Sequence, residues 1–250
     1  MIGLFDSGVG GLAVLREVRA MLPEADLIYL ADQAHAPYGR KTLDEVRARS
    51  EEATRRLIER GATTVVIACN TASAAALGRV RASHPGVSFV GMEPAVKPAA
   101  AVTKTGRVAV LATPTTFDAS VFDELVGRHG AGITVIAHPC PGWAMAVEEG
   151  WPVGALAPVR AHLAPLVESG VDTMVIACTH YSFLGDVLAE ACGPAVTVID
   201  PAEAVARQVT RLADGSGSGA TTYLTTGDPE TFAGQVLRLL GEHVVAERIL

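Results

Sequence analysis

An α/β fold with parallel sheets is predicted by three observations. Short apolar runs alternate with amphipathic stretches along the chain, the order in which parallel strands and their connecting helices follow one another. Of the 250 residues, 49% are hydrophobic but only 5% are aromatic, so the apolar residues are mainly aliphatic, the usual filling of helices and buried parallel strands. The length corresponds to between one and two domains and allows a core that needs no disulfide or metal.

Eight apolar runs have the length and composition of strands: residues 2–5, 27–30, 64–68, 88–90, 107–111, 133–136, 173–177 and 196–199. Helical patterns lie between them, and the clearest spans residues 42–60, followed by Gly61 as a stop signal. One face of this helix carries Leu43, Val46, Ala53 and Leu57. The polar face carries three expected i,i+4 ion pairs: Glu45 with Arg49, Glu51 with Arg55, and Glu52 with Arg56.

We expect the eight strands to form two four-stranded units. The segment near residues 92–101, with two prolines and an alanine-rich run, marks a boundary, and the Gly/Ser run at 215–219 indicates a flexible surface loop. The segment from residue 221 onward is expected to return to the first unit. The predicted first domain therefore comprises residues 1–95 and 209–250, and the second comprises residues 96–208.

A short internal repeat supports two similar units. The segment TVVIACNT at 64–71 resembles TMVIACTH at 173–180, and each follows a helical pattern that ends at glycine. Each copy places a cysteine, Cys69 or Cys178, after a predicted strand, where open α/β sheets bind ligands. Asn70 or Thr71 in one copy and Thr179 in the other are expected to cap the next helix. That helix terminus is expected to lower the thiol pKa, so both thiols would exchange protons near neutral pH; the alternative is a pair of small buried hydrophobes.

The other two of the four cysteines, Cys140 and Cys192, lack this context and are interpreted as structural. A cytoplasmic chain keeps its thiols reduced. No CxxC spacing is present, so a zinc site has little support and no metal is predicted.

Two facing thiols suit racemisation at a carbon acid. One thiolate removes the α-proton while the thiol on the opposite face delivers a new one, and the roles exchange in the reverse direction. Because an α-proton is weakly acidic, such a site also needs preorganised donors for the carbanion-like state.

Other segments supply candidate ligand-binding groups. The glycine-rich segment DSGVGGL at 6–12 follows the first strand, and its Asp6 either orients a substrate amine or caps a helix. The segment has neither the GxGxxG pattern nor a GK[ST] sequence, so it is not a P-loop. A protein that binds a nucleotide or phosphate at these glycines is the alternative function from another class. His180 shares the loop of Cys178 and is interpreted as an acid–base helper or a ligand donor; the alternative is a structural histidine. The remaining candidates are the turn at 37–39 and the hydroxyls of Thr113, Thr115 and Thr116, suited to a carboxylate or simply to a helix start.

The overall composition excludes several other classes. The net charge of −7 and the pI near 5.5 argue against a general nucleic-acid binder. No run of about 18 apolar residues indicates a membrane span. The N-terminus has no signal-peptide pattern, so a cytoplasmic location is expected.

The motifs, taken in order, resemble the glutamate racemase family of cofactor-independent enzymes that supply D-glutamate for peptidoglycan. The segments that carry the resemblance cover most of the chain: 6–12, Asp32 with 37–39, 68–72, 91–95, 114–116, 147–150 and 177–181. Ser182 stands where the family usually has proline, which loosens a turn. Pro152 and Pro158, after Gly150, affect only local structure.

The resemblance implies two pseudosymmetric α/β domains with mainly parallel sheets and an active site in the cleft between them. Cys69 and Cys178 match the catalytic thiols, Asp6 and His180 match the residues that assist them, and Glu148 or its neighbour Glu149 matches a further acidic helper. The matched substrate-binding residues are Asp6, Ser7, Tyr38, Gly39, Asn70, Thr71, Thr179 and His180. Glutamate is the implied substrate, no cofactor is implied, and a homodimer is expected. A two-thiol racemase acting on aspartate or hydantoins is the alternative.

Overall fold

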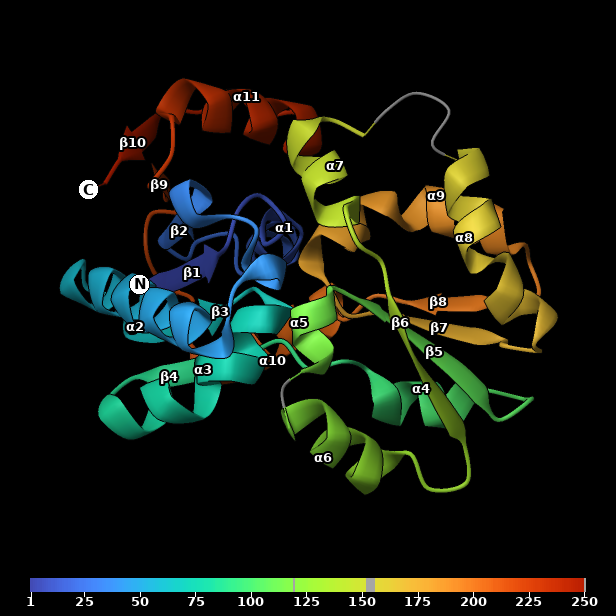
Figure 1. Cartoon of the computed structure of the whole chain (residues 1–250). Helices are drawn as coiled ribbons and strands as arrows, with labels where there is room; N and C mark the ends of the chain where they lie inside the picture. The colour runs from blue at the N-terminus through green and yellow to red at the C-terminus, as the bar shows by residue number, and fades with distance from the viewer. Residues whose placement is uncertain (119, 152–155, 250) are drawn as a thin grey trace.

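Two parallel β-sheets form the centre of the computed structural model, which describes residues 1–118, 120–151 and 156–249 (Figure 1). Within these residues, the larger sheet consists of β10 (Ala246–Arg248), β9 (Thr221–Thr225), β2 (Leu27–Ala31), β1 (Ile2–Asp6), β3 (Thr64–Ile67) and β4 (Ser88–Gly91), in that spatial order. The smaller sheet consists of β6 (Thr134–Pro139), β5 (Arg107–Ala112), β7 (Thr173–Ile176) and β8 (Thr197–Ile199). Neighbouring strands pair in parallel throughout the described sheets.

All eight predicted strands are present within a few residues of their expected bounds, which confirms the α/β prediction. The prediction of four strands per sheet is wrong for the larger sheet, because β9 and β10 extend it beyond β2. Strand β10 consists of Ala, Glu and Arg, residues with little strand preference, so no sequence pattern marks it. The predicted domain bounds, 1–95 with 209–250 and 96–208, stay a prediction.

Helices cover both faces of each sheet (Figure 1). On the larger sheet these are α1 (Leu12–Met21), α10 (Ala202–Leu212) and α11 (Pro229–Leu240) on one face, and α2 (Leu43–Glu59) and α3 (Asn70–Ser83) on the other. On the smaller sheet, α8 (Leu156–Glu168) and α9 (Gly185–Cys192) lie opposite α4 (Val96–Val102) and α6 (Ser120–His129). Shorter helices follow several strands: η1 (Gln33–His35), η2 (Tyr38–Arg40), α5 (Pro114–Phe117), α7 (Trp143–Glu149) and η3 (Thr179–Leu184).

The central strands are buried on both faces, which is why they appear in the sequence as continuous apolar runs. In β1, Ile2 and Leu4 point into the core beneath α1 and α10, whereas Phe5 points into a second core beneath α2 and α3. The first core also contains Leu163 of α8 and Leu188 of α9. The two sheets therefore share one continuous hydrophobic core.

The clearest predicted helix forms as α2. Thr42 and Glu45 make a capping box, in which Thr42 Oγ1 accepts from the Glu45 N–H at 3.3 Å and Glu45 Oε2 accepts from the Thr42 N–H at 2.8 Å. On the predicted apolar face, Val46, Ala53 and Leu57 are buried and Leu43 is half-buried. Gly61, with a φ of 90°, ends the helix.

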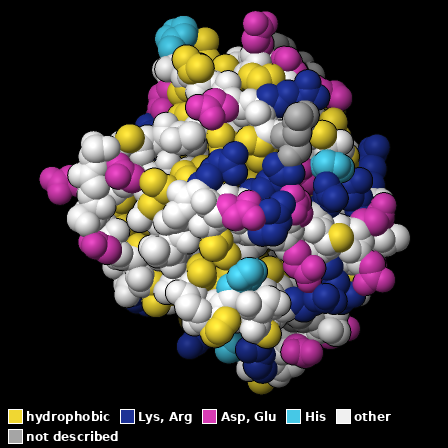
Figure 2. Space-filling model, turned by 90° about the vertical axis from the view of Figure 1, so that its left-hand side faces the viewer, with side chains coloured by type: hydrophobic (Ala, Val, Ile, Leu, Met, Phe, Trp, Pro, Cys, Tyr) yellow, Lys and Arg dark blue, Asp and Glu magenta, His cyan; other side chains and the backbone are white. Residues whose placement is uncertain are grey.

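One of the three ion pairs predicted on the polar face of α2 is confirmed, with Arg56 Nε 2.6 Å from Glu52 Oε1. The other two are replaced by different contacts: Arg55 with Glu52 and Glu59, Glu51 with Arg79, and Arg49 with His35. Residues at i,i+3 and on neighbouring elements lie as near as those at i,i+4, so spacing alone does not select a partner. Figure 2 shows acidic and basic side chains interspersed on this side of the molecule.

Two other expectations concern the helices. No helix among the described residues combines the length and the apolar character needed to cross a membrane. Of the two prolines that follow Gly150, Pro152 lies outside the described residues, and Pro158 lies in the first turn of α8.

Candidate active site

The carboxyl ends of β1, β3 and β7 bring both repeated cysteines to one cavity between the two sheets. The cavity has a volume of about 20 Å³. Eleven of the predicted site residues line it: Ser7, Tyr38, Gly39, Cys69, Asn70, Thr71, Thr113, Glu148, Cys178, Thr179 and His180. The other three predicted residues, Asp6, Thr115 and Thr116, are buried and do not line this cavity. The two halves of the repeat therefore meet at a single site.

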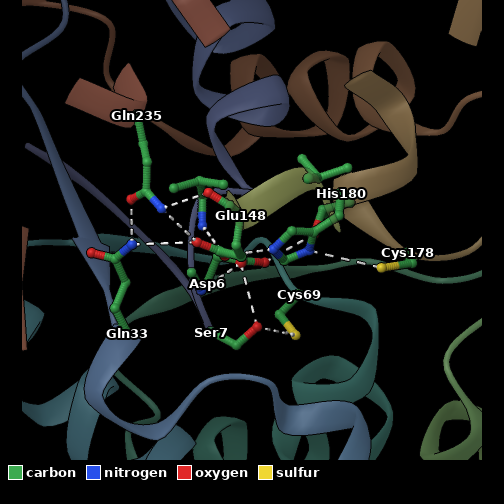
Figure 3. A network of polar contacts seen from close by, with 12 residues as sticks. Asp6, Ser7, Gln33, Cys69, Glu148, Cys178, His180 and Gln235 are labelled. Atoms are coloured by element: carbon green, nitrogen blue, oxygen red, sulfur yellow. Dashed lines mark hydrogen bonds and ion pairs between the residues drawn. The ribbon is translucent and has the colours of Figure 1, made fainter. Parts of the chain in front are cut away.

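Asp6 reaches Cys69 through Ser7 (Figure 3). The Cys69 thiol lies 3.9 Å from Ser7 Oγ, and Ser7 Oγ lies 3.5 Å from Asp6 Oδ1. The carboxylate also accepts the Gly8 N–H at 2.8 Å and the Thr179 hydroxyl at 2.9 Å. Burial raises the pKa of Asp6, against the opposing effects of His180 and these hydrogen bonds. This set, which we call the Cys69 arm, consists of Cys69, Ser7 and Asp6.

A second set of contacts, the Cys178 arm, consists of Cys178, His180 and Glu148 (Figure 3). Cys178 Sγ lies 3.8 Å from His180 Nδ1, and His180 Nε2 lies 2.7 Å from Glu148 Oε1. Burial lowers the pKa of His180, but the contacts with Cys178 and Glu148 outweigh it and raise that pKa well above its usual range. Burial likewise opposes ionisation of Glu148, yet the hydrogen bond from His180 leaves its pKa lowered. Both directions favour an imidazolium beside a carboxylate.

Of the two neighbouring glutamates between which the acidic helper was left open, Glu148 contacts His180. Glu148 is buried against His180, whereas Glu149 is exposed. Both residues lie at the end of α7, and only the one that faces η3 reaches the histidine.

Sequence reasoning missed two glutamines that hold Glu148. Gln33 Nε2 donates to Glu148 Oε2 at 3.3 Å, and Gln235 Nε2 donates to the same oxygen at 3.2 Å (Figure 3). The two glutamines also bond each other at 2.6 Å. Gln33 directly follows Asp32, which belongs to the segments that carry the family resemblance, so its position could have been considered. Gln235 of α11 is distant in sequence, and no local pattern marks it.

The expected effect of the helix terminus on Cys69 is wrong in direction. Burial, followed by the charge of Asp6, raises the pKa of Cys69, although the Ala72 N–H acts in the expected sense. The predicted caps are also wrong: Cys69 and Cys178 themselves occupy the N-cap positions of α3 and η3, and neither helix start has a side-chain cap. The strands end one residue earlier than predicted, which moves each cysteine into the turn.

The predicted hydroxyl residues connect the two sheets. Thr71 of α3 lies 3.1 Å from both Thr113 and Thr116, whose hydroxyls are 3.0 Å apart. Thr115 Oγ1 donates to the Gly39 carbonyl at 2.9 Å. Among the described residues, the buried side-chain amide of Asn70 has no hydrogen-bond partner for either its nitrogen or its oxygen. That amide is free to bind a ligand in the cavity.

Tyr38 is held by the aspartate that begins its segment. Its hydroxyl donates to Asp32 Oδ2 at 2.6 Å, and burial together with Asp32 raises the pKa of Tyr38. Tyr38 therefore enters the cavity as a neutral phenol.

The glycines of the 6–12 segment allow the second sheet's residues to approach the backbone. A Cβ on Gly8 would lie 1.8 Å from Glu148 Oε1, and a Cβ on Gly10 would lie 2.5 Å from His180 Nδ1. The Val9 N–H donates to Glu148 Oε1 at 2.8 Å. The loop therefore binds the Glu148 carboxylate of the protein itself. This contact argues against the hypothesis that the loop binds a phosphate.

The chain is similar to known racemases over most of its length. The family model for Asp/Glu/hydantoin racemases matches residues 12–209. The chain is 46% identical over 248 residues to the glutamate racemase of Roseiflexus sp. (strain RS-1), covering 95% of this chain and 91% of that protein. Among solved structures, glutamate racemase RacE1 from Bacillus anthracis superposes with a TM-score of 0.91 at 28% identity, over 100% of this chain and 97% of that one.

A second solved structure carries bound ligands. The Escherichia coli glutamate racemase, in complex with L-glutamate and the activator UDP-MurNAc-Ala, superposes with a TM-score of 0.87 at 30% identity, over 100% of this chain and 98% of that one.

Proposed function

The chain belongs to the Asp/Glu/hydantoin racemase family, and on that basis we propose that it interconverts L-glutamate and D-glutamate without a cofactor. The observation that carries this proposal is the single cavity lined by Cys69 and Cys178, each at the end of its own arm of polar residues. Similarity to glutamate racemases over nearly the whole chain favours glutamate over aspartate or hydantoins as the substrate.

The proposed reaction removes the proton from one face of the α-carbon and adds a proton to the opposite face. The thiolate of one cysteine removes the α-proton, and the thiol of the other protonates the opposite face, so the configuration inverts. In the reverse direction the two thiols exchange roles. Neither step transfers electrons to or from the protein.

We propose different roles for the two arms. His180, held as an imidazolium by Glu148, places a positive charge 3.8 Å from Cys178 Sγ and supports negative charge on that sulfur. Asp6, through Ser7, lies behind Cys69 and disfavours a thiolate there. In this scheme Cys69 is a protonated thiol before substrate binds.

The substrate's charged groups need partners inside the cavity. The amide of Asn70, without a partner among the described residues, offers an NH2 group as donor and a carbonyl oxygen as acceptor, and the hydroxyl oxygens of Ser7, Thr71 and Thr179 can accept further hydrogen bonds. We propose that these groups, with the backbone of Tyr38 and Gly39, hold the carboxylates and the ammonium of glutamate. A cavity of about 20 Å³ holds roughly one water molecule, and we propose that the two sheets separate to admit glutamate.

We further propose that the product D-glutamate serves peptidoglycan synthesis in the cytoplasm and that the active form is a homodimer. These proposals rest on the family membership and on the ordered motifs of the sequence. Light scattering of the purified protein would give a mass twice that of the 25.9 kDa chain if the dimer forms.

A racemisation assay on a substrate panel tests the proposed activity. Purified protein incubated with L-glutamate and no added cofactor is expected to produce D-glutamate until the enantiomers are equal. Aspartate and hydantoins are tested in parallel, and a faster reaction with either would contradict the assignment of glutamate. A strict requirement for pyridoxal phosphate would contradict the mechanism.

A further inference from the structure

A cluster of metal-ligating side chains lies outside the catalytic cavity, at the carboxyl end of β6. His138 and Cys140 lie on either side of Pro139, and His162 reaches them from α8. One nitrogen of each imidazole and the thiol of Cys140 all lie within 4.8 Å of one another. Cys140 is buried and the two histidines are half-buried. The catalytic proposal uses none of these three residues.

The three donor atoms have the chemistry of a zinc site. Zn²⁺ prefers tetrahedral nitrogen and sulfur ligands, with bonds of about 2.0–2.1 Å to imidazole and about 2.3 Å to thiolate. Tetrahedral ligands at these bond lengths are about 3.5 Å apart, so the cluster must contract by about 1 Å. All three side chains have rotatable bonds, and a strand end and a helix fix their backbones.

The donor atoms of the cluster have few competing protein contacts. Among the described residues, His138 Nε2 is buried and has no hydrogen-bond partner. Cys140 Sγ makes only a long contact of 3.6 Å with the His138 carbonyl. His162 Nε2 lies 3.2 Å from the Pro139 carbonyl, and the two imidazole rings have centroids 4.6 Å apart.

The pKa shifts of His138 and Cys140 act on metal binding in opposite directions. Burial, with the neighbouring His162, lowers the pKa of His138, so its ring is neutral and can act as a ligand. Burial raises the pKa of the Cys140 thiol, a direction that a bound divalent cation reverses.

We propose that His138, Cys140 and His162 form a Zn²⁺ site distinct from the catalytic thiols. Binding displaces the Cys140 thiol proton to solvent and forms a sulfur–zinc bond, while each imidazole contributes a lone pair. No electron is transferred. A water molecule completes the tetrahedron as the fourth ligand.

The contacts around the cluster indicate what such a site would do. The Tyr181 hydroxyl, one residue after His180, donates to the Cys140 carbonyl at 2.9 Å. The ring of Trp143, at the start of α7, lies 5.3 Å from that of His162 and 5.4 Å from that of Tyr181. Zinc would therefore stabilise the start of α7 and η3, which carry Glu148 and His180, without touching the substrate.

Cobalt titration tests the proposal, because Co²⁺ replaces Zn²⁺ in such sites and reports thiolate ligands by a near-ultraviolet charge-transfer band. The full chain with Cys69→Ser and Cys178→Ser is used, so that the catalytic thiols cannot bind the metal. We expect one Co²⁺ per chain with this band. We also expect quenching of tryptophan fluorescence, because both tryptophans of the chain, Trp143 and Trp151, lie in this region.

Substitutions identify the ligands. Cys140→Ser is expected to abolish the band. His162 is half-buried, and His162→Gln is expected to lower the Zn²⁺ affinity, measured by competition with Co²⁺, more than about 100-fold. Substitution of residues that only support metal ligands already lowers affinity by about 10–100-fold. Cys192→Ser and His129→Gln serve as matched controls and should bind as the parent does. A band that survives Cys140→Ser, an unchanged affinity in His162→Gln, or the absence of any cobalt thiolate band in the parent would overturn the proposal. Circular dichroism confirms that each variant is folded before it is titrated.

Discussion

The pair formed by His180 and Glu148 makes stability depend on pH in two directions. The raised pKa of His180 contributes stability that is complete below its usual value of 6.5 and lost as pH rises through the folded value. The lowered pKa of Glu148 contributes stability that is present above its usual value of 4.5 and lost as pH falls through the folded value. Both contributions are present between pH 4.5 and pH 6.5, the usual pKa values of the two groups, so the free energy of unfolding is expected to be highest in that range.

Replacing Glu148 by glutamine tests this pair. Glu148→Gln leaves a buried imidazolium without its carboxylate, so we expect a loss of about 3 kcal/mol in the free energy of unfolding at pH 7. Racemisation should fall as well, and the dependence of stability on pH should flatten. Denaturant titrations across pH measure the effect, with Glu149→Gln, the exposed neighbour, as control. Equal behaviour of the two variants would contradict the assignment of Glu148.

Each thiol is expected to be indispensable. Because a serine hydroxyl is a far weaker acid than a thiol, Cys69→Ser and Cys178→Ser should each lower the rate of racemisation by about 10³-fold or more. Cys192→Ser, a thiol packed on Met174 of β7, should remain near the parent rate. In heavy water the product should carry deuterium at the α-carbon. Near-parent turnover in either active-site variant, or a product that keeps its original hydrogen, would rule out the two-thiol mechanism.

The close contact between the Gly8 backbone and the Glu148 carboxylate gives a further prediction. A methyl group at Gly8 would overlap Glu148 Oε1, so Gly8→Ala should destabilise the protein by about 1–3 kcal/mol and reduce racemisation. Gly127 in α6 has no atom within 4 Å of its would-be Cβ, so Gly127→Ala should stabilise by about 0.5–1 kcal/mol. The melting temperature should fall in Gly8→Ala and rise in Gly127→Ala, and the racemisation rate should fall only in Gly8→Ala. A Gly8→Ala variant as stable and active as the parent would show that the loop does not need its glycine.

At the scale of elements, the capping box of α2 predicts a measurable stability effect. Thr42→Ala removes the hydroxyl that accepts the Glu45 N–H, and we expect a loss of about 1 kcal/mol in the free energy of unfolding. Thr42→Ser keeps the hydroxyl and should retain most of the stability. Urea titrations compare the three proteins, and equal losses in both variants would point to the methyl group instead of the cap.

Elements buried on both faces could be predicted from the sequence, and those determined by distant partners could not. The strands β1, β3 and β7 appear as apolar runs because helices cover both of their faces. Strand β9, Thr-Thr-Tyr-Leu-Thr, contains residues typical of strands, but its pairing with β2 joins segments far apart in the chain. Within the site, the ordered motifs identified most of the cavity lining, whereas the support of Glu148 by Gln235 depends on where α11 packs. The pKa of Cys69 was misjudged because burial outweighs the local effect of the helix start.

At the scale of the whole molecule, ligand binding should report on the closed cavity. A ligand that binds only the native state stabilises it by about 2.7 kcal/mol at 100 times its Kd. We therefore expect D-glutamate to raise the melting temperature and ATP to leave it unchanged, since Glu148 occupies the glycine-rich loop. Calorimetry measures both. A shift with ATP and none with D-glutamate would favour a nucleotide ligand.

The order of strands in the larger sheet has a consequence for synthesis on the ribosome. Strand β2 is flanked by β1 and by β9, and β9 follows the entire smaller sheet in the chain. A nascent chain that has emerged as far as β4 therefore holds β2 as an open, apolar edge until more than a hundred further residues have been translated. The smaller sheet can fold in this interval. The larger sheet is complete only after β9 and β10, the last strands of the chain, have been translated. Until then the open edge of β2 is the part of the nascent protein most in need of a chaperone.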